Sequence, residues 1–149
     1  MTNLKQLTRW LFLVLAAIPA HGSQVLAAET ASPGNQMNLE LNKLEDYEKG
    51  CRAYLVVNNP ANANYQSFKL DLVLFQGDGV IGRRVALELG PLRPQKKTVK
   101  IFELENTPCD KIGSFLVNEI LECKSETGPV ADCLKQITTT ALTAVKFSK

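Results

Sequence analysis

The sequence predicts an all-β domain, an immunoglobulin-like antiparallel β-sandwich of about seven strands, preceded by an N-terminal signal peptide. Short runs that alternate apolar and polar residues recur through residues 38–149, which is the pattern of half-buried strands. Gly, Pro and Asn separate these runs about every ten residues, and no long helical period interrupts them. The chain has 149 residues, 45% hydrophobic and 21% charged, as expected for a leader and one globular domain.

Residues 1–28 have the three parts of a signal peptide. Lys5 and Arg9 form a basic start, and the apolar run Trp10–Ile18 follows it. This run is too short to span a membrane, which takes about 20 apolar residues, so we expect cleavage rather than anchoring. Thr8 precedes Arg9, so a twin arginine is absent and the general secretory route is expected. Small residues offer three cleavage positions, after Gly22, Ala27 or Ala28.

Removal of the leader changes the composition in an informative way. The single His21 and the single Trp10 both lie in the leader, so the mature chain has neither residue type. Lys5 and Arg9 are also lost, which leaves 15 basic residues against 15 acidic ones. A neutral chain is not expected to bind nucleic acid, and a chain without His cannot use histidine as a catalytic base.

Residues 29–37 are polar and predict a loose mature N-terminus, and residues 38–149 predict a single domain. The first strand is expected over 39–45, where Leu residues begin the apolar pattern. The second is expected over 51–57, which is rich in β-forming residues and stops at Asn58-Asn59-Pro60.

The next two strands are predicted to form a hairpin. Every second residue from Phe68 to Leu74 is apolar, which places these side chains on one face of a strand over 68–75. The turn Gly77-Asp78-Gly79 returns the chain into a strand over 80–89.

Three further strands complete the predicted sandwich. Over 97–104, Val99 and Ile101 share one face, and Phe102 and Leu104 share the other. The apolar run over 114–122 is compatible with a helix by composition, but its neighbours favour a strand. The Thr- and Val-rich tail predicts the last strand over 134–147.

Four cysteines remain after cleavage, and an exported chain is expected to pair them as two disulfides. Four cysteines allow three connectivities. In an immunoglobulin-like sandwich the second and fifth strands are antiparallel neighbours, which favours Cys51–Cys109. Cys123 and Cys133 would then close the connection between the last two strands. The chain has no C-x-x-C pair, so we expect neither a zinc site nor another metal centre.

Several segments resemble a family of small exported proteins of alphaproteobacteria, usually labelled "Tat pathway signal sequence domain protein". The resemblance covers nearly the whole mature domain and implies a Gram-negative periplasm and a single β domain. The label describes the leader and carries no activity, so no catalytic residue is transferred, and the missing twin arginine departs from it. The matching segments are LELNKL (39–44), CRAYLV (51–56), KLDLVLF (69–75), GDGVIGRR (77–84), GPL (90–92), CD-x-IG (109–113) and GP-x-ADC (128–133).

No residue pattern predicts a catalytic centre or a cofactor. Ser67 and Ser114 lack the surroundings of a nucleophile, and Gly77-Asp78-Gly79 has too few acids for a calcium loop. Carboxylates could do acid–base chemistry in pairs, but nothing in the sequence singles out one pair. The acidic candidates are Glu45, Asp46, Glu48, Glu103, Glu105, Glu119 and Glu122.

A run of positive charge is the strongest candidate for a functional surface. Between residues 83 and 100 the chain has six basic residues and one acid, Glu88. On two adjacent strands they would form a stripe for an anionic partner, or they would protect a sheet edge from aggregation. Tyr47, Tyr54 and Tyr65 offer a second candidate contact patch. The six basic residues are Arg83, Arg84, Arg93, Lys96, Lys97 and Lys100.

These observations favour a non-enzymatic periplasmic domain that binds an envelope protein or an anionic envelope component. A small-ligand carrier or a carboxylate-based hydrolase is the alternative, and it would need a deep pocket with two acids of raised pKa. A purely structural envelope protein is a third reading.

Overall fold

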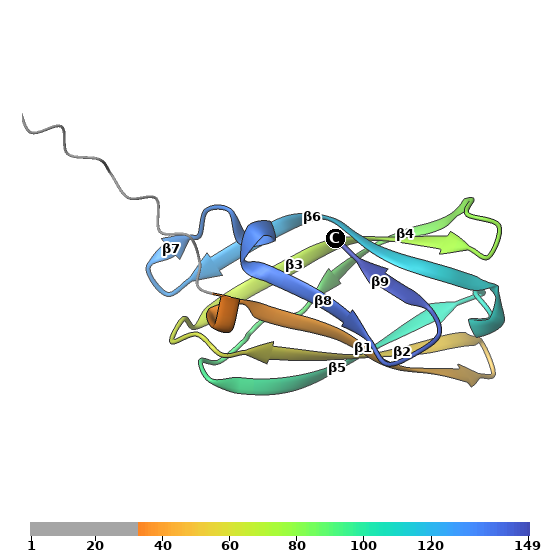
Figure 1. The fold of residues 1–149 in the computed structure, drawn as a ribbon, viewed down its shortest axis with the longest axis horizontal. Helices are drawn as coiled ribbons and strands as arrows, with labels where there is room; N and C mark the ends of the chain where they lie inside the picture. The colour runs from red at the N-terminus through yellow and green to blue at the C-terminus, as the bar shows by residue number, and fades with distance from the viewer. Residues whose placement is uncertain (1–32) are drawn as a thin grey trace, which may run out of the picture.

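The computed structural model describes residues 33–149, so the predicted signal peptide and residues 29–32 lie outside the described residues. The described chain forms a sandwich of two β-sheets, as predicted (Figure 1). One sheet has four strands in the order β5-β2-β1-β8, and the other has five, β4-β3-β6-β7 with β9 added beside β6. The strands are β1 (Met37–Tyr47), β2 (Gly50–Asn59), β3 (Tyr65–Gln76), β4 (Ile81–Glu88), β5 (Lys96–Glu105), β6 (Ile112–Ser125), β7 (Gly128–Pro129), β8 (Ile137–Ala141) and β9 (Lys146–Ser148).

The predicted loose segment is structured in its described part. Pro33–Asn35 form a short 3-10 turn, and β1 begins at Met37, one residue before the predicted domain. The Gln36 side chain donates a hydrogen bond to the Lys135 carbonyl, and Met37 is buried in the core. These contacts order the segment despite its polar sequence.

The predicted last strand over 134–147 is divided into three parts. Cys133–Gln136 form a 3-10 turn, β8 then pairs parallel to β1, and β9 pairs parallel to β6 in the opposite sheet. The chain crosses between the sheets after β8 because Ile137 is buried on the first sheet and Phe147 on the second. The single long strand predicted here is therefore wrong. With the two-residue β7 added, the division raises the number of strands from the predicted seven to nine.

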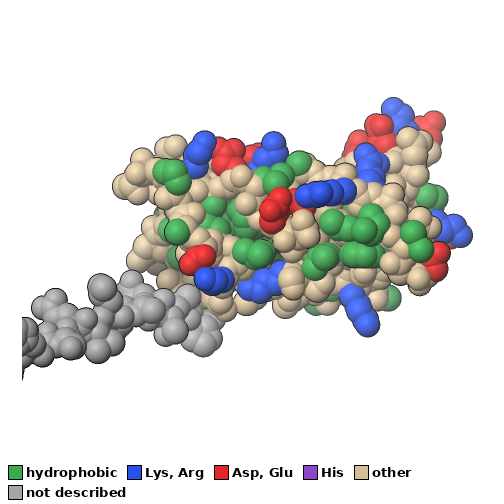
Figure 2. All heavy atoms as spheres, turned by 90° about the horizontal axis from the view of Figure 1, so that it is seen from above, with side chains coloured by type: hydrophobic (Ala, Val, Ile, Leu, Met, Phe, Trp, Pro, Cys, Tyr) green, Lys and Arg blue, Asp and Glu red, His purple; other side chains and the backbone are tan. Residues whose placement is uncertain are grey.

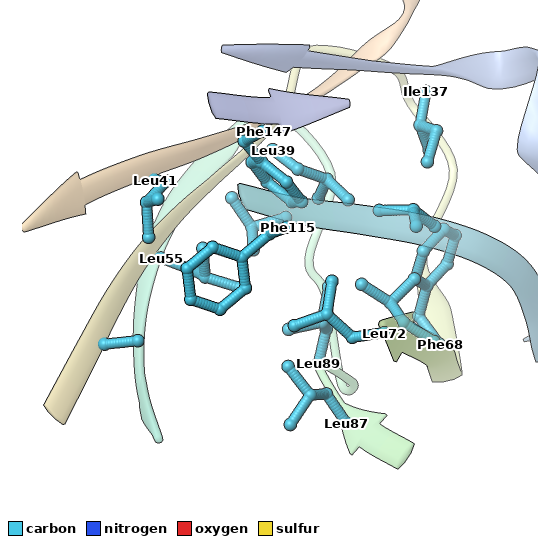
Figure 3. Packing of buried hydrophobic residues seen from close by; sticks show 14 of the residues in the cluster. Leu39, Leu41, Leu55, Phe68, Leu72, Leu87, Leu89, Phe115, Ile137 and Phe147 are labelled. Carbon is cyan, nitrogen blue, oxygen red and sulfur yellow. The ribbon is translucent and has the colours of Figure 1, made fainter. Parts of the chain in front are cut away.

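The core lies between the two sheets. Leu39, Leu41 and Leu55 point inward from the four-stranded sheet and meet Phe68 and Phe115 from the five-stranded sheet (Figure 3). The Phe115 ring also packs edge-to-face against Phe147, at 6.3 Å between centroids. Burying large apolar side chains from both sheets is the main force that holds the two layers together.

Both predicted cysteine pairs lie at disulfide distance. Cys51 and Cys109 have Cα atoms 4.8 Å apart, and Cys123 and Cys133 have Cα atoms 6.6 Å apart. The first pair joins β2 to the 3-10 turn after β5, and β2 and β5 are antiparallel neighbours, as the prediction required.

None of residues 33–149 forms a helix with the length and apolarity of a membrane crossing.

Candidate functional site

The six predicted basic residues do not form one stripe. β4 is an edge of the five-stranded sheet and β5 is an edge of the four-stranded sheet, so consecutive strands place their charges in different layers. On the face that Figure 2 shows, apolar patches lie between basic and acidic side chains. Two of the six residues lie on β4, one lies in the connection before β5, two lie at the start of β5 and one lies in its middle.

The two β4 arginines already have partners. The Arg84 guanidinium donates a hydrogen bond from Nε to Asp71 at 2.6 Å and lies 3.7 Å from Glu119. Arg83 donates from Nη1 to the Glu105 carbonyl at 2.6 Å and lines a cavity of about 240 Å³ beside Lys111. Arg84 therefore ties β4 to its neighbour β3, and Arg83 ties β4 to the end of β5 in the other sheet, which leaves less of their charge for a partner.

Asp71 is a polar group of β3 that the sequence alone did not single out. It lies on the outer face of the five-stranded sheet, yet it is only 3% exposed, because Arg84 and Asn118 cover it. The hydrogen bond from Arg84 lowers the pKa of Asp71, and the bond from Asn118 acts in the same direction against the effect of burial. The carboxylate is thus held ionised as part of the sheet surface.

We expect Asp71→Asn to reduce the loss of stability at acid pH, so that the free energy of unfolding changes less between neutral and acid pH than in the wild type. A carboxyl whose pKa is lowered by folding stabilises the protein above its unfolded pKa, near 4, and this stability is lost as the pH falls through the folded pKa. Urea unfolding at about pH 7 and at about pH 3 would measure the difference. Glu122→Gln, at a more exposed carboxyl paired with Lys124, should change the profile less. If the free energy of unfolding fell equally with pH in the wild type and in Asp71→Asn, the stabilising role of the ionised Asp71 would be contradicted.

The other basic residues lie along the β4–β5 connection and β5. Lys100 points between the sheets, where its Nζ donates to the Gly90 carbonyl at 3.2 Å. Arg93, just before β5, and Lys96 and Lys97, at its start, are exposed, and among residues 33–149 no carboxylate lies within ion-pair distance of any of them. We call these three residues the basic end. Arg83 and Lys100 also lack a carboxylate partner but bond to backbone carbonyls, whereas the side chains of the basic end have no such bond in the described chain.

Asn59 fixes the shape of the basic end. This side chain is 1% exposed, and its Nδ2 donates to the carbonyls of Ala63 and Arg93, at 2.8 and 3.0 Å. Gln95, at a positive φ of 51°, donates its backbone N–H to the Ala61 carbonyl. The chain before β5 is therefore fastened to the loop after β2. In the sequence, Asn59 indicates only that the second strand ends, as part of Asn58-Asn59-Pro60.

Asn59 also lines a cavity of about 260 Å³, although the three side chains of the basic end do not line it. Tyr65 of β3 lines the same cavity, and the Asn59 Oδ1 atom is buried without a hydrogen-bond donor. Burial of the ring raises the pKa of Tyr65. The remaining lining is mostly amide side chains, which can donate and accept hydrogen bonds but carry no charge. These lining residues are Asn35, Gln36, Asn62 and Gln136.

The three predicted contact tyrosines do not meet. Tyr65 lies in the core, whereas Tyr54 and Tyr47 lie on the outer face of the four-stranded sheet. There the Lys43 ammonium sits 5.4 Å from the Tyr54 ring centre, and the Arg52 guanidinium 4.9 Å from that of Tyr47. These contacts give each ring a local role in the sheet surface.

The acidic candidates are spread over the molecule. Glu45 pairs with Lys43 and Arg52, and Glu103 also pairs with Arg52. Glu119 and Glu122 line an open groove of about 470 Å³ beside the Cys123–Cys133 bridge. The hydrogen bond from Lys124 lowers the pKa of the Glu122 carboxyl, whereas a general acid requires a raised pKa. Across the described range, no three His, Cys, Asp or Glu side chains are grouped to hold a metal ion.

Comparisons with known proteins add no assignment. No protein-family model matches the chain, and neither the curated proteins nor the solved structures give a match. The basic end and the cavity beside Asn59 are the features of the described chain that indicate a function.

Proposed function

We propose that this chain is a non-enzymatic domain of the periplasm that binds an anionic component of the cell envelope through the basic end. The single observation that carries the proposal is the cluster of Arg93, Lys96 and Lys97, exposed and without carboxylate partners in the described chain. Elsewhere in the described chain, Lys43, Arg52, Arg84 and Lys124 each lie beside an acid on the same or a neighbouring strand. Three free cations on a rigid strand start attract phosphate or carboxylate groups.

The cavity beside Asn59 supports a ligand that has hydroxyl groups as well as charge. Its amide side chains can both donate and accept hydrogen bonds, which suits hydroxyl groups. A phosphorylated headgroup or sugar supplies both kinds of group, with the phosphate at the basic end and hydroxyls at the amides. A neutral small ligand held in the cavity alone is the second candidate, and it would make the protein a carrier.

The compartment belongs to the same proposal. Two disulfides favour an oxidising space, and the basic and apolar leader with small residues after it favours export. The resemblance to exported alphaproteobacterial proteins favours the periplasm. We also infer an immunoglobulin-like relationship, because β5-β2-β1 and β3-β6 reproduce the grouping of its strands.

Charge reversal at the basic end is expected to weaken binding about tenfold or more, because each cation near an anionic surface contributes about 1 kcal/mol. The variant is Arg93→Glu with Lys96→Glu, and the probes are phosphatidylglycerol vesicles and lipopolysaccharide micelles, measured by co-sedimentation. The first probe presents the phosphate on a lipid, and the second presents it on a sugar.

The matched control is Lys49→Glu with Lys146→Glu, which makes the same charge change at two other exposed cations. The control should keep most of the binding. Equal losses in both variants would show a general charge effect and contradict a site. Absence of wild-type binding to both probes would overturn the anionic-component proposal. Capture of a periplasmic protein by wild type and not by the variant would then favour an envelope protein as the partner.

A further inference from the structure

β5 is the long open edge of the four-stranded sheet. It pairs with β2 along its whole length, and no strand of the described chain pairs with its other side. The opposite edge of the same sheet is the short β8, which packs near β9. An open edge presents unpaired backbone N–H and C=O groups, which are a template for another strand.

The outer face of β5 has an unusual side-chain order. Val99 is 59% exposed and Ile101 is 54% exposed, and they stand opposite Val56 and Tyr54 of β2. Exposed apolar side chains on an edge strand are generally avoided, since they promote pairing with another chain. Lys97 and Glu103 flank the two apolar residues on the same face, one positive and one negative. The outer face therefore has the order Lys97, Val99, Ile101, Glu103.

This order is complementary to itself, and we propose that β5 pairs antiparallel with β5 of a second copy of this chain. In the register with Lys100 opposite its own copy, Val99 faces Ile101 of the second copy. In that same register Lys97 faces Glu103 of the second copy, and each contact occurs twice by symmetry. Directly opposed residues of an antiparallel pair have Cβ atoms about 5 Å apart, close enough for both kinds of contact.

The charges already present fit this arrangement. Glu103 accepts a hydrogen bond from Arg52 at 2.9 Å and remains 51% exposed, so it can receive a second cation. The Lys97 side chain is exposed and has no carboxylate within ion-pair distance in residues 33–149. Pairing shifted by two residues in either direction would set Val99 against itself or against Glu103, and both Lys97–Glu103 contacts would be lost.

Lys100 limits the strength of the pairing. It points inward from the middle of β5, and in the proposed register it approaches Lys100 of the second copy. Its Nζ bond to the Gly90 carbonyl draws the charge toward the chain before β5. An inward charge on an edge is a device that weakens edge pairing, so we expect a dimer that forms and separates rather than an obligate one.

The test uses sedimentation velocity of the purified full-length chain with its disulfides oxidised. Wild type should form a dimer in a concentration-dependent way. Lys97→Glu alone and Glu103→Lys alone should each weaken dimerisation about tenfold or more, because each turns two attractive pairs into repulsive ones. An equal mixture of the two variants should regain the wild-type affinity in the mixed dimer, because both of its symmetric positions are attractive again. At one position the two substituted side chains face each other with opposite charges, and at the other the native Lys97 faces the native Glu103.

Two further variants keep the proposal falsifiable. Glu103→Lys also disturbs the hydrogen bond between Arg52 and Glu103 within one chain. Arg52→Gln removes that bond alone, and it should leave the dimer intact. Lys100→Gln should tighten the dimer severalfold by removing the one like-charge contact. A wild type and Lys100→Gln that stay monomeric at the highest soluble concentration would overturn the proposal, as would a mixture no tighter than its components. The Arg93→Glu, Lys96→Glu variant should remain dimeric, so loss of anion binding and loss of pairing are separate results.

Discussion

Replacing Cys51 and Cys109 together by Ala is expected to lower the free energy of unfolding by about 4 kcal/mol. The bridge joins residues 58 positions apart, so it removes much of the freedom of the unfolded chain. The Cys123–Cys133 bridge spans only 10 positions, and its removal should cost about 3 kcal/mol by the same relation.

Urea unfolding of the two double variants, followed by fluorescence or circular dichroism, measures both values. The second double variant is the matched control, because it loses one bridge and two sulfurs as well. A larger loss for Cys123 and Cys133 than for Cys51 and Cys109 would contradict the loop-length argument. It would indicate that the short bridge holds native contacts around β7 that the long bridge does not.

Phe115→Ala is expected to cost about 3 to 5 kcal/mol, the usual range for removing a buried aromatic ring. Phe115 is 2% exposed and lies at the centre of the sandwich, where β6 meets β9 through Phe147. Loss of the ring leaves a cavity that the two sheets cannot close without moving their strands. Leu41 and Leu55 would lose packing on the facing sheet (Figure 3).

The control for this prediction is Ile101→Ala, which removes part of an exposed side chain from β5 and should change the stability of the monomer by less than about 0.5 kcal/mol. Denaturant midpoints at low protein concentration keep any pairing of β5 out of the comparison. A loss below about 1 kcal/mol for Phe115→Ala would show that the core repacks around the gap.

The sequence predicts strands well where the alternation of side chains is regular. In β3 every second residue from Phe68 to Leu74 is buried, as expected. In β6 the pairing with β3 shifts at several positions, near Asn118 and Leu121 among others. Each bulge moves the following side chains to the opposite face. This explains why the composition of that segment was compatible with a helix as well as a strand.

The candidate site was harder to predict, because it depends on which strands become neighbours. Arg84 and Lys96 are close in sequence but belong to different sheets. Counting charges along the chain therefore predicted one stripe from residues that the fold places apart. The burial of Asp71 on an outer face requires side chains from both adjacent strands. The Cys51–Cys109 pair was predictable because the antiparallel pairing of β2 and β5 was expected from the fold class, and Cys123–Cys133 was then the remaining pair.

The parallel pairings of the last two strands have a consequence for how the chain reaches its folded state. β8 binds β1 and β9 binds β6, so the first sheet joins residues about a hundred positions apart, such as Asn38 and Thr138. Contacts this distant in sequence form late and slowly. The four-stranded sheet is incomplete until β8 has emerged from the machinery that makes or exports the chain, and the five-stranded sheet is incomplete until β9 has emerged. Under the export proposed above, the polypeptide would therefore cross the membrane unfolded and complete both sheets on the far side.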